Sequence, residues 1–300
     1  MTVSGHATTT ATDATSTTTA TDAPSFALGG DLVVNRLGYG SMQLTGEGVW
    51  GPPSDHTGAL RVLRAAVEAG VNLIDTADSY GPAVAEPLIA EALHPYPESL
   101  VVATKAGLTR PGPGDWVPVG RPEYLKQQVE FSLRFLKQER IDLIQLHRID
   151  ADVPLADQLG AFAELKEQGK VRHIGVSEVS VDELKAAREI TEIVSVQNLY
   201  NLTNRQSQDV LDYATAEGIA FIPWFPIATG DLAGPQSPVA EIAAELDATP
   251  SQVALAWLLH ASPVMLPIPG TKSIEHLNEN MAAAALTLSD DDVARLDRLA

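Results

Sequence analysis

Apolar and polar residues follow two patterns that alternate along the chain. Short, mostly apolar runs such as residues 100–104 are typical of buried strands, and longer stretches with one apolar face, such as residues 122–137, are typical of helices. Strands are expected over residues 36–40, 71–75, 100–104, 141–146, 171–175, 193–197, 219–224 and 264–268. Helices are expected over residues 58–69, 84–93, 122–137, 155–167, 181–189, 206–216, 237–246 and 251–260, and from residues 273 and 290.

Strands that alternate with helices predict a parallel sheet whose two faces are both covered. Eight such βα units over about 270 residues predict a single-domain (β/α)8 TIM barrel. An open, doubly wound sheet is the alternative. It has less support, because Gly38-Tyr39-Gly40 runs into a Gly/Pro-rich loop over residues 45–55 and not into the helix that a dinucleotide-binding fingerprint requires.

Residues 1–24 differ from the rest in composition. They are nearly all Thr, Ala, Ser and Asp, which offer almost nothing to bury, so a disordered extension is expected before a barrel domain over residues 25–300. We expect this extension to be dispensable, and the alternative is that it has a function of its own.

Charge and composition exclude several classes of function. The chain has 20 basic and 39 acidic side chains, a net charge of −19, which argues against nucleic acid or an anionic membrane as a partner. It has no cysteine, so disulfides, thiolate catalysis and Cys-bound zinc are excluded. No apolar run reaches the ~20 residues of a membrane span. No Lys or Arg precedes Arg36, whereas a secretory signal begins with a basic region, so a cytoplasmic location is expected.

The expected strands end in polar residues that make chemical sense together. Asp75 ends the second strand with Tyr80 shortly beyond, Lys105 ends the third and His147 the fourth. The carboxyl ends of the strands carry the active site in such barrels. An ammonium group beside a tyrosine lowers the tyrosine pKa, a carboxylate keeps that ammonium charged, and a histidine can bind an oxygen on which charge develops. The set therefore suits the protonation of an oxygen during reduction of a carbonyl group.

Each of these residues has a simpler interpretation. Asp75 or Asp78 could cap the next helix, and Tyr80 could be a packed loop aromatic. Lys105 could be a surface cation or a Schiff-base lysine, and His147 could be structural. Only their occurrence together on three consecutive strand ends favours catalysis.

Five segments together resemble the aldo-keto reductase superfamily. They are Leu73-Ile-Asp-Thr-Ala-Asp-Ser-Tyr-Gly81, Thr104-Lys105, residues 143–147, Ile174-Gly-Val-Ser177 and Gln197-Asn198, and the resemblance covers roughly residues 30 to 300. It implies a (β/α)8 barrel with Asp75, Tyr80, Lys105 and His147 as the catalytic tetrad. Tyr80 would be the general acid, Lys105 would tune it, Asp75 would pair with Lys105, and His147 would orient the carbonyl.

The same resemblance implies NADPH as cofactor, with NADH also possible. Ser177 and Gln197 match positions that bind the nicotinamide amide, and Trp224 matches the aromatic residue that stacks on the ring. Gly270-Thr-Lys272-Ser and Glu279-Asn280 resemble the site for the adenosine and the 2′-phosphate. Gly40, Met42 and Gln43, at the end of the first strand, are expected to line the cofactor side.

Two positions depart from the family pattern. Glu178, which is expected to bind the cofactor, stands where many members have Asn. An ionised Glu can accept from the NH₂ of the nicotinamide carboxamide but cannot donate to its oxygen, so Ser177 and Gln197 are expected to supply the donors. His276 stands where many members have Arg near the 2′-phosphate. Histidine is largely neutral at pH 7, so the phosphate would depend on Lys272 and the preference for NADPH would be weaker.

The substrate is expected to be a small carbonyl compound, an aldehyde or a ketone. Gln43, Trp50 and Trp116 are candidates for its pocket, although both tryptophans could equally anchor loops.

Three other functions are alternatives. A metal-dependent hydrolase would require a His/Asp cluster with ligand spacing, which the sequence does not show. A Schiff-base aldolase that uses Lys105 would leave Ser177, Gln197 and Trp224 unexplained. A nucleotide-sensing or regulatory relative of the reductases is the remaining alternative. The oligomeric state cannot be read from the sequence.

Overall fold

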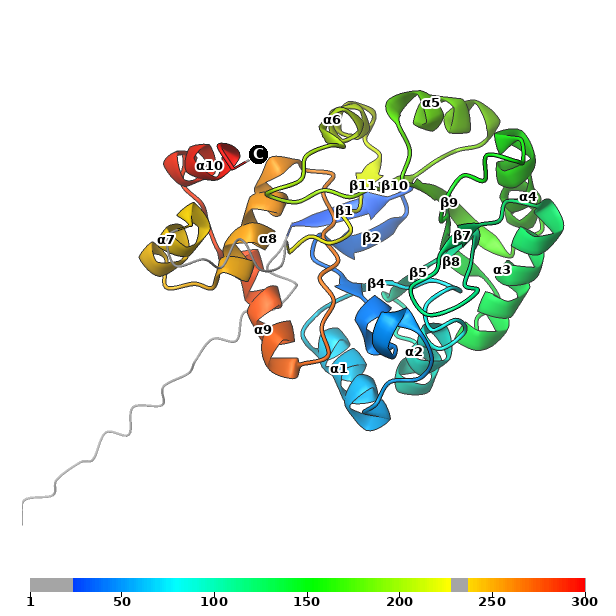
Figure 1. The fold of residues 1–300 in the computed structure, drawn as a ribbon, viewed down its shortest axis with the longest axis horizontal. Helices are drawn as coiled ribbons and strands as arrows, with labels where there is room; N and C mark the ends of the chain where they lie inside the picture. The colour runs from blue at the N-terminus through cyan, green and yellow to red at the C-terminus, as the bar shows by residue number, and fades with distance from the viewer. Residues whose placement is uncertain (1–23, 228–236, 300) are drawn as a thin grey trace, which may run out of the picture.

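Seven parallel strands form the centre of the molecule. A computed structural model of the chain describes residues 24–227 and 237–299, so the expected extension lies, except for residue 24, outside the described residues. The strands follow one another around the sheet in the order β3 (Tyr39–Gly40), β4 (Leu73–Asp75), β5 (Val101–Ala106), β8 (Ile141–Leu146), β9 (Val171–Ser177), β10 (Ser195–Gln197) and β11 (Ala220–Phe221). Helices surround them (Figure 1).

Residues 264–269 close the sheet into a barrel. Phe221 N donates to Val264 O and Leu266 N to Phe221 O, while on the other side Gly38 N donates to Pro267 O at 2.9 Å. The segment therefore occupies the place of an eighth strand, and the predicted (β/α)8 barrel is confirmed. The regular strand predicted over 264–268 is wrong, because Pro267 has no N–H to donate and the ladder is interrupted there.

Ten α-helices lie in the described part of the chain. They are α1 (His56–Glu68), α2 (Ala85–Leu93), α3 (Pro122–Leu136), α4 (Leu155–Glu167), α5 (Val181–Ile190), α6 (Gln208–Glu217), α7 (Pro238–Glu245), α8 (Pro250–Ala261), α9 (Ile274–Ala282) and α10 (Asp290–Asp297). The first eight begin and end within two residues of the predicted bounds, and α9 and α10 begin within one residue of the predicted starts. Eight follow the barrel strands in turn, while α7 and α10 pack against each other beside α8 (Figure 1). None of these helices is both long and apolar enough to span a bilayer.

An antiparallel hairpin covers the amino-terminal end of the barrel. It consists of β1 (Ser25–Leu28) and β2 (Leu32–Asn35), joined through Gly29 and Gly30, and the sequence analysis did not predict it. Leu28 and Val34 are fully buried in the same cluster as the apolar side chains of the barrel interior. The chain continues through residues 36–38 to β3, so the first barrel strand starts at Tyr39 and not, as predicted, at Arg36.

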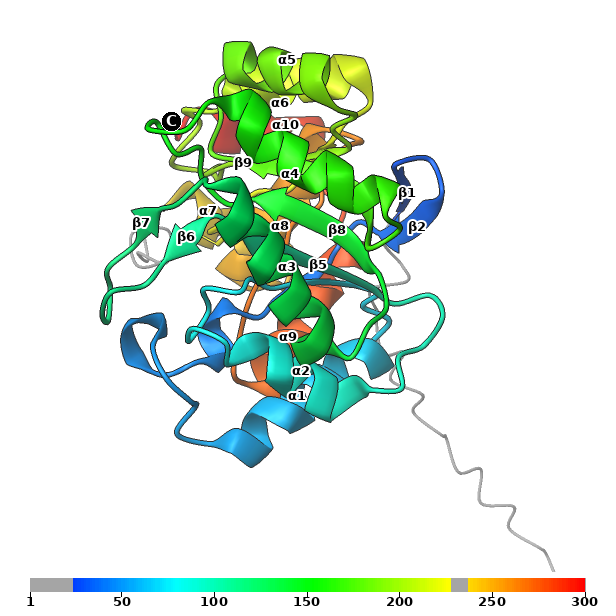
Figure 2. The same cartoon turned by 90° about the vertical axis from the view of Figure 1, so that its right-hand side faces the viewer.

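A second short hairpin lies at the opposite end of the barrel (Figure 2). It is formed by β6 (Leu108–Thr109) and β7 (Val117–Pro118), in the loop that follows β5. Because the first hairpin covers one end, the polar carboxyl ends of the strands are accessible only from this second end.

Candidate active site

Lys105 is the buried centre of the polar cluster at this end of the barrel. Its Nζ donates to Asp75 Oδ1 at 2.5 Å, to the main-chain oxygen of Thr76 at 2.9 Å and to the Tyr80 hydroxyl at 3.2 Å. Asp75 ends β4, Tyr80 lies in the following loop, and Lys105 belongs to the neighbouring strand β5. Three of the four expected catalytic side chains therefore meet at one ammonium group.

The second carboxylate oxygen of Asp75 is also held in place. Oδ2 accepts from Gln197 Nε2 at 2.9 Å and from Gln145 Nε2 at 3.2 Å, inside the barrel. With both oxygens bonded, Asp75 is fixed in its orientation toward Lys105. The sequence analysis missed Gln145. The signal was available, because Gln145 lies two residues after Leu143, which faces the barrel interior, and side chains two apart on a strand share a face.

His147 completes the cluster directly after β8. Its ring centroid lies 6.0 Å from that of Tyr80, and its Nδ1 lies 3.2 Å from the Ser79 hydroxyl. The Ser79 hydroxyl can donate to Nδ1 or accept from it, and in the tautomer in which it donates, the ring proton is on Nε2. Asp75, Tyr80, Lys105 and His147 are thus brought together at one mouth of the barrel.

Burial and the neighbouring charges act in opposite directions on the pKa values of Lys105 and Tyr80. Burial opposes the charge on Lys105, but Asp75 and Tyr80 outweigh it and raise the Lys105 pKa above its usual value. Burial raises the pKa of Tyr80, whereas the Lys105 ammonium lowers it. Tyr80 is therefore protonated at neutral pH, with a cation in contact that stabilises its phenolate form.

His147 is uncharged at neutral pH. Burial lowers its pKa well below the usual range, and the positive charges of Lys105, Arg148 and Arg110 lower it further. A neutral ring can donate one hydrogen bond into the cavity without adding a net charge there.

Neither Asp75 nor Asp78 caps the helix that follows β4. The N-cap residue of α2 is Val84, and no side chain caps that helix. Asp78 is buried, and burial together with the nearby Glu86 raises its pKa well above the usual range. The capping interpretation is therefore wrong for both residues.

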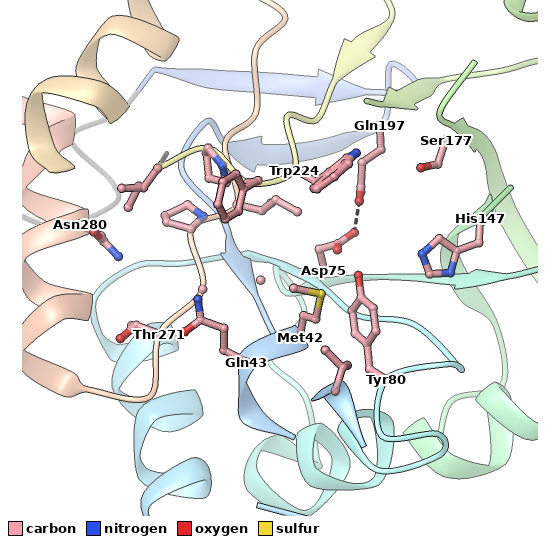
Figure 3. A pocket seen from close by; sticks show the side chains of 18 of the residues that line it. Met42, Gln43, Asp75, Tyr80, His147, Ser177, Gln197, Trp224, Thr271 and Asn280 are labelled. Carbon is pink, nitrogen blue, oxygen red and sulfur yellow. Dashed lines mark hydrogen bonds between the residues drawn. The ribbon is translucent and has the colours of Figure 1, made fainter. Parts of the chain in front are cut away.

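A cavity of about 840 Å³ opens beside the cluster, a volume typical of ligand pockets. Tyr80, His147 and Ser177 lie on one side of it, and Asn280 from α9 on the other (Figure 3). Most of the residues expected to bind cofactor or substrate line it: Gly40, Met42, Gln43, Trp116, Ser177, Gln197, Trp224, Gly270, His276, Glu279 and Asn280. Three of these expected residues do not belong to its lining, namely Glu178, Lys272 and Trp50, and neither does the expected catalytic Lys105. Nowhere in residues 24–227 and 237–299 do three His, Asp or Glu side chains gather as metal ligands would.

The profile described as the aldo/keto reductase family matches residues 36–300. The chain belongs to this family. An uncharacterized oxidoreductase of Schizosaccharomyces pombe is 50% identical over 268 residues, covering 89% of this chain and 87% of the relative. Pyridoxine 4-dehydrogenase of Escherichia coli is 45% identical over 270 residues, covering 88% and 94%. The crystal structure of an aldo-keto reductase from Klebsiella pneumoniae in complex with NADPH is similar with a TM-score of 0.79 and 26% identity, covering 92% and 95%.

In this aldo-keto reductase, Gln197 and Ser177 present different hydrogen-bonding groups to the cavity. The Nε2 donor of Gln197 is directed at the Asp75 carboxylate, which can only accept, so Gln197 offers its oxygen as an acceptor. The expectation that Gln197 supplies a donor is therefore wrong. Ser177 Oγ accepts from Arg148 Nη1 at 3.1 Å, which leaves its own hydroxyl proton free to donate.

Glu178 lies behind Trp224 and not in the cavity. Its Oε1 accepts from the Trp224 indole Nε1 at 2.6 Å and from Leu199 N at 2.7 Å. Its φ of 55° is in the left-handed region, which Asn adopts more readily than Glu. The two hydrogen bonds offset that backbone strain. Glu178 thus holds Trp224, and a direct contact with the carboxamide, as expected from the sequence, does not fit this geometry.

The beginning of α9 forms the far end of the cavity. Ser273 caps the helix by accepting from His276 N at 3.3 Å, and His276, Glu279 and Asn280 face the cavity. Lys272 lies outside, at a smaller hollow that also includes Gln43 and Thr45, where its Nζ donates to Thr45 O at 3.3 Å.

The two tryptophans of the loops differ in position. Trp116 lines the cavity, edge-on to Tyr80 with ring centroids 6.3 Å apart, whereas Trp50 does not. Arg110 lies 3.6 Å from the Trp116 ring centroid and donates to Ser79 O and Val49 O in two other loops. Arg110, which the sequence analysis did not single out, therefore ties together the three loops around the site.

Proposed function

We propose that this chain is an NADPH-dependent reductase of aldehyde or ketone carbonyls in which Tyr80 donates the proton. The observation that carries the proposal is the contact of the buried Lys105 ammonium with both the Asp75 carboxylate and the Tyr80 hydroxyl at the edge of the cavity. A tyrosine in contact with a cation can give up its proton to an oxygen on which negative charge develops.

The cavity fits an extended nucleotide with a reactive end. When bound, NADPH supplies the hydride that reaches the carbonyl carbon. Trp224 would cover one face of its ring, while Ser177 would donate to the carboxamide and Gln197 would accept from it. His276, Glu279 and Asn280 would contact the adenosine end. The first N–H groups of α9 favour an anion there, which suits a phosphate.

The residues of the cluster then act on the carbonyl oxygen. Tyr80 and His147 Nε2 hydrogen-bond that oxygen and orient the carbonyl. As the carbon accepts the hydride, the electron pair of the C=O bond moves to the oxygen, which takes the Tyr80 proton and becomes the alcohol. Lys105 stabilises the phenolate that remains, and Asp75 keeps Lys105 charged and directed at Tyr80. The reverse sequence oxidises an alcohol with Tyr80 as the base.

Pyridoxine and its 4-aldehyde, pyridoxal, are the first substrates we propose. The support is the 45% identity to a relative named pyridoxine 4-dehydrogenase, which extends over 94% of that protein. Trp116 and Trp224 line the cavity and offer aromatic surfaces on which a flat ring can pack.

The test is the loss of NADPH absorbance by the purified chain with pyridoxal and a panel of aromatic and aliphatic aldehydes and ketones. Substrate-dependent oxidation of NADPH, with the alcohol recovered in equal amount, is expected, and reactions without the carbonyl compound are the control. Tight NADPH binding without turnover of any carbonyl would contradict the proposal and favour the nucleotide-sensing alternative.

A further inference from the structure

Arg148 is a cation at the reactive end of the cavity that the mechanism above does not use. It directly follows His147 and lines the cavity together with Tyr80, His147 and Ser177. Among the described lining residues it is the one Lys or Arg side chain. The Asp75 carboxylate at this end is paired with Lys105, so its charge is already compensated.

The guanidinium of Arg148 forms no ion pair or hydrogen bond with a carboxylate in the described parts of the chain; Glu178, whose Oε1 is bonded to Trp224, is the nearby carboxylate that raises its pKa. Its Nη1 donates to His147 O at 2.6 Å and to Ser177 Oγ at 3.1 Å, both uncharged acceptors. Neither Nε nor Nη2 donates to another described residue. An arginine carries five N–H donors in a planar fork that matches a carboxylate or a phenolate oxygen, so this side chain retains unused capacity for an anion.

The charge of Arg148 reaches the reacting groups. Burial lowers the Arg148 pKa, yet a guanidinium remains protonated near neutral pH. Its positive charge lowers the pKa of both Tyr80 and His147, the two residues between which the carbonyl oxygen would bind. An anionic group attached close to the carbonyl would therefore lie near the guanidinium, while the rest of the substrate would pack on apolar residues such as Leu108, Trp116 and Pro118.

We propose that Arg148 selects carbonyl substrates that carry an anionic oxygen, a carboxylate or a phenolate, close to the reacting carbonyl. This inference rests on the proposed function and names a substrate class for the same site. The whole chain carries a net charge of −19 and repels anions at long range, so recognition of such a substrate depends on a local cation.

The experiment compares two aldehydes that differ in one charge. 2-Formylbenzoate has a carboxylate beside the aldehyde, and its methyl ester has the same ring and aldehyde without the charge. kcat/KM is measured for both at saturating NADPH in the wild type, in Arg148→Gln and in Arg148→Lys. The readout is the ratio of kcat/KM for the acid to kcat/KM for the ester, which cancels any loss that the two substrates share.

The ratio is expected to fall roughly 10- to 100-fold in Arg148→Gln, the effect of losing one charge-assisted hydrogen-bonded pair, and to recover partly in Arg148→Lys. For 4-formylbenzoate, whose carboxylate is across the ring, the fall relative to its own methyl ester should be several-fold smaller. The control is Arg134→Gln, which removes the same charge from an exposed position in the last turn of α3 and should leave the ratio unchanged.

An equal loss for acid and ester, with a raised KM for NADPH, would overturn the inference and assign Arg148 to the cofactor. An unchanged ratio in Arg148→Gln would also overturn it, and both results leave the proposed reductase intact. If the wild type reduces none of these aldehydes, charged or uncharged, and no pyridoxal, the proposed function itself fails, and the inference about Arg148 fails with it.

Discussion

Tyr80 is the residue on which the proposed chemistry depends, and burial and charge act on its pKa in opposite directions. Burial raises the Tyr80 pKa, which keeps the proton in place at neutral pH, and the Lys105 ammonium lowers it, which prepares for its release. Reduction needs the protonated phenol, and oxidation of the alcohol needs the phenolate. The two directions of the reaction should therefore depend on pH in opposite senses.

We expect Lys105→Met to shift the alkaline part of the oxidation profile to higher pH. Oxidation accelerates as pH rises through the Tyr80 pKa, and removing a cation that lowers this pKa moves the rise upward. Because the Tyr80 pKa is already raised, initial rates of alcohol oxidation are measured from neutral pH up to the most alkaline pH at which both proteins stay folded. Lys185→Met, on the exposed side of α5, is the matched control. A profile that keeps its midpoint in Lys105→Met would show that Lys105 does not tune Tyr80.

At the scale of single residues, the sequence predicted that Asp75, Tyr80, Lys105 and His147 lie together, but not how every neighbour is used. Residue type and place at a strand end sufficed for Asp75, Lys105 and His147, because parallel strands bring their carboxyl ends together. The role of Glu178 could not be predicted in the same way. It depends on a left-handed φ of 55° and on the position of the Trp224 indole, both of which arise from tertiary packing.

The beginning of α9 is the element on which we expect the choice of cofactor to depend. NADPH and NADH differ in the 2′-phosphate, so a preference requires cations or N–H groups beside it. His276 faces the cavity there, whereas Lys272 lies at the adjacent smaller hollow. We therefore expect a preference for NADPH that is smaller than in a reductase with Arg at position 276.

His276→Arg should tighten NADPH binding roughly tenfold with little effect on NADH, because a guanidinium adds a charge-assisted contact with a phosphate. Lys272→Ala should weaken NADPH binding selectively. Dissociation constants of both cofactors, from the quenching of tryptophan fluorescence, measure these changes, with His56→Arg on α1 as the control. Equal affinities for the two cofactors in the wild type, unaltered in Lys272→Ala, would show that this region does not bind the phosphate.

The elements that the sequence predicted least well are those in which a pattern is short or interrupted. The four-residue strands β1 and β2, on either side of the turn that contains Gly29 and Gly30, were not predicted, although a pair of glycines between apolar runs indicates a hairpin. Residues 264–268 have the apolar character of a strand, but Pro267 removes a donor, so barrel closure relies on hydrogen bonds that a regular ladder does not include. The long amphipathic helices had no such interruptions and were predicted to within two residues.

The two ends of the barrel differ: a hairpin covers the amino-terminal end, and polar side chains gather at the carboxyl end. The β1–β2 hairpin fills the amino-terminal end with Leu28 and Val34, and the polar cluster around Lys105 occupies the carboxyl end. The residues before the hairpin have a composition with little to pack. Stability should therefore depend on the hairpin and not on residues 1–24.

Deleting residues 1–24 is expected to leave the melting temperature and the rate of carbonyl reduction nearly unchanged. Leu28→Ala in the full chain should lower the free energy of unfolding by about 2–5 kcal/mol, because it opens a cavity in the barrel interior. Val33→Ala, on the same hairpin but 61% exposed, is the matched control with a small effect. Denaturant unfolding of the variants measures these differences. A large loss of stability on deletion would show that the extension packs against the barrel.

The rate of carbonyl reduction by Tyr80→Phe tests the central claim most directly. The substitution removes the hydroxyl that contacts Lys105 and keeps the ring, so the dissociation constant of NADPH should change little while kcat falls roughly 10²- to 10⁴-fold. Single-turnover mixing with a carbonyl compound that the wild type reduces separates the chemical step from product release. A chemical step in Tyr80→Phe that keeps most of the wild-type rate would show that another group supplies the proton and would contradict the proposed mechanism.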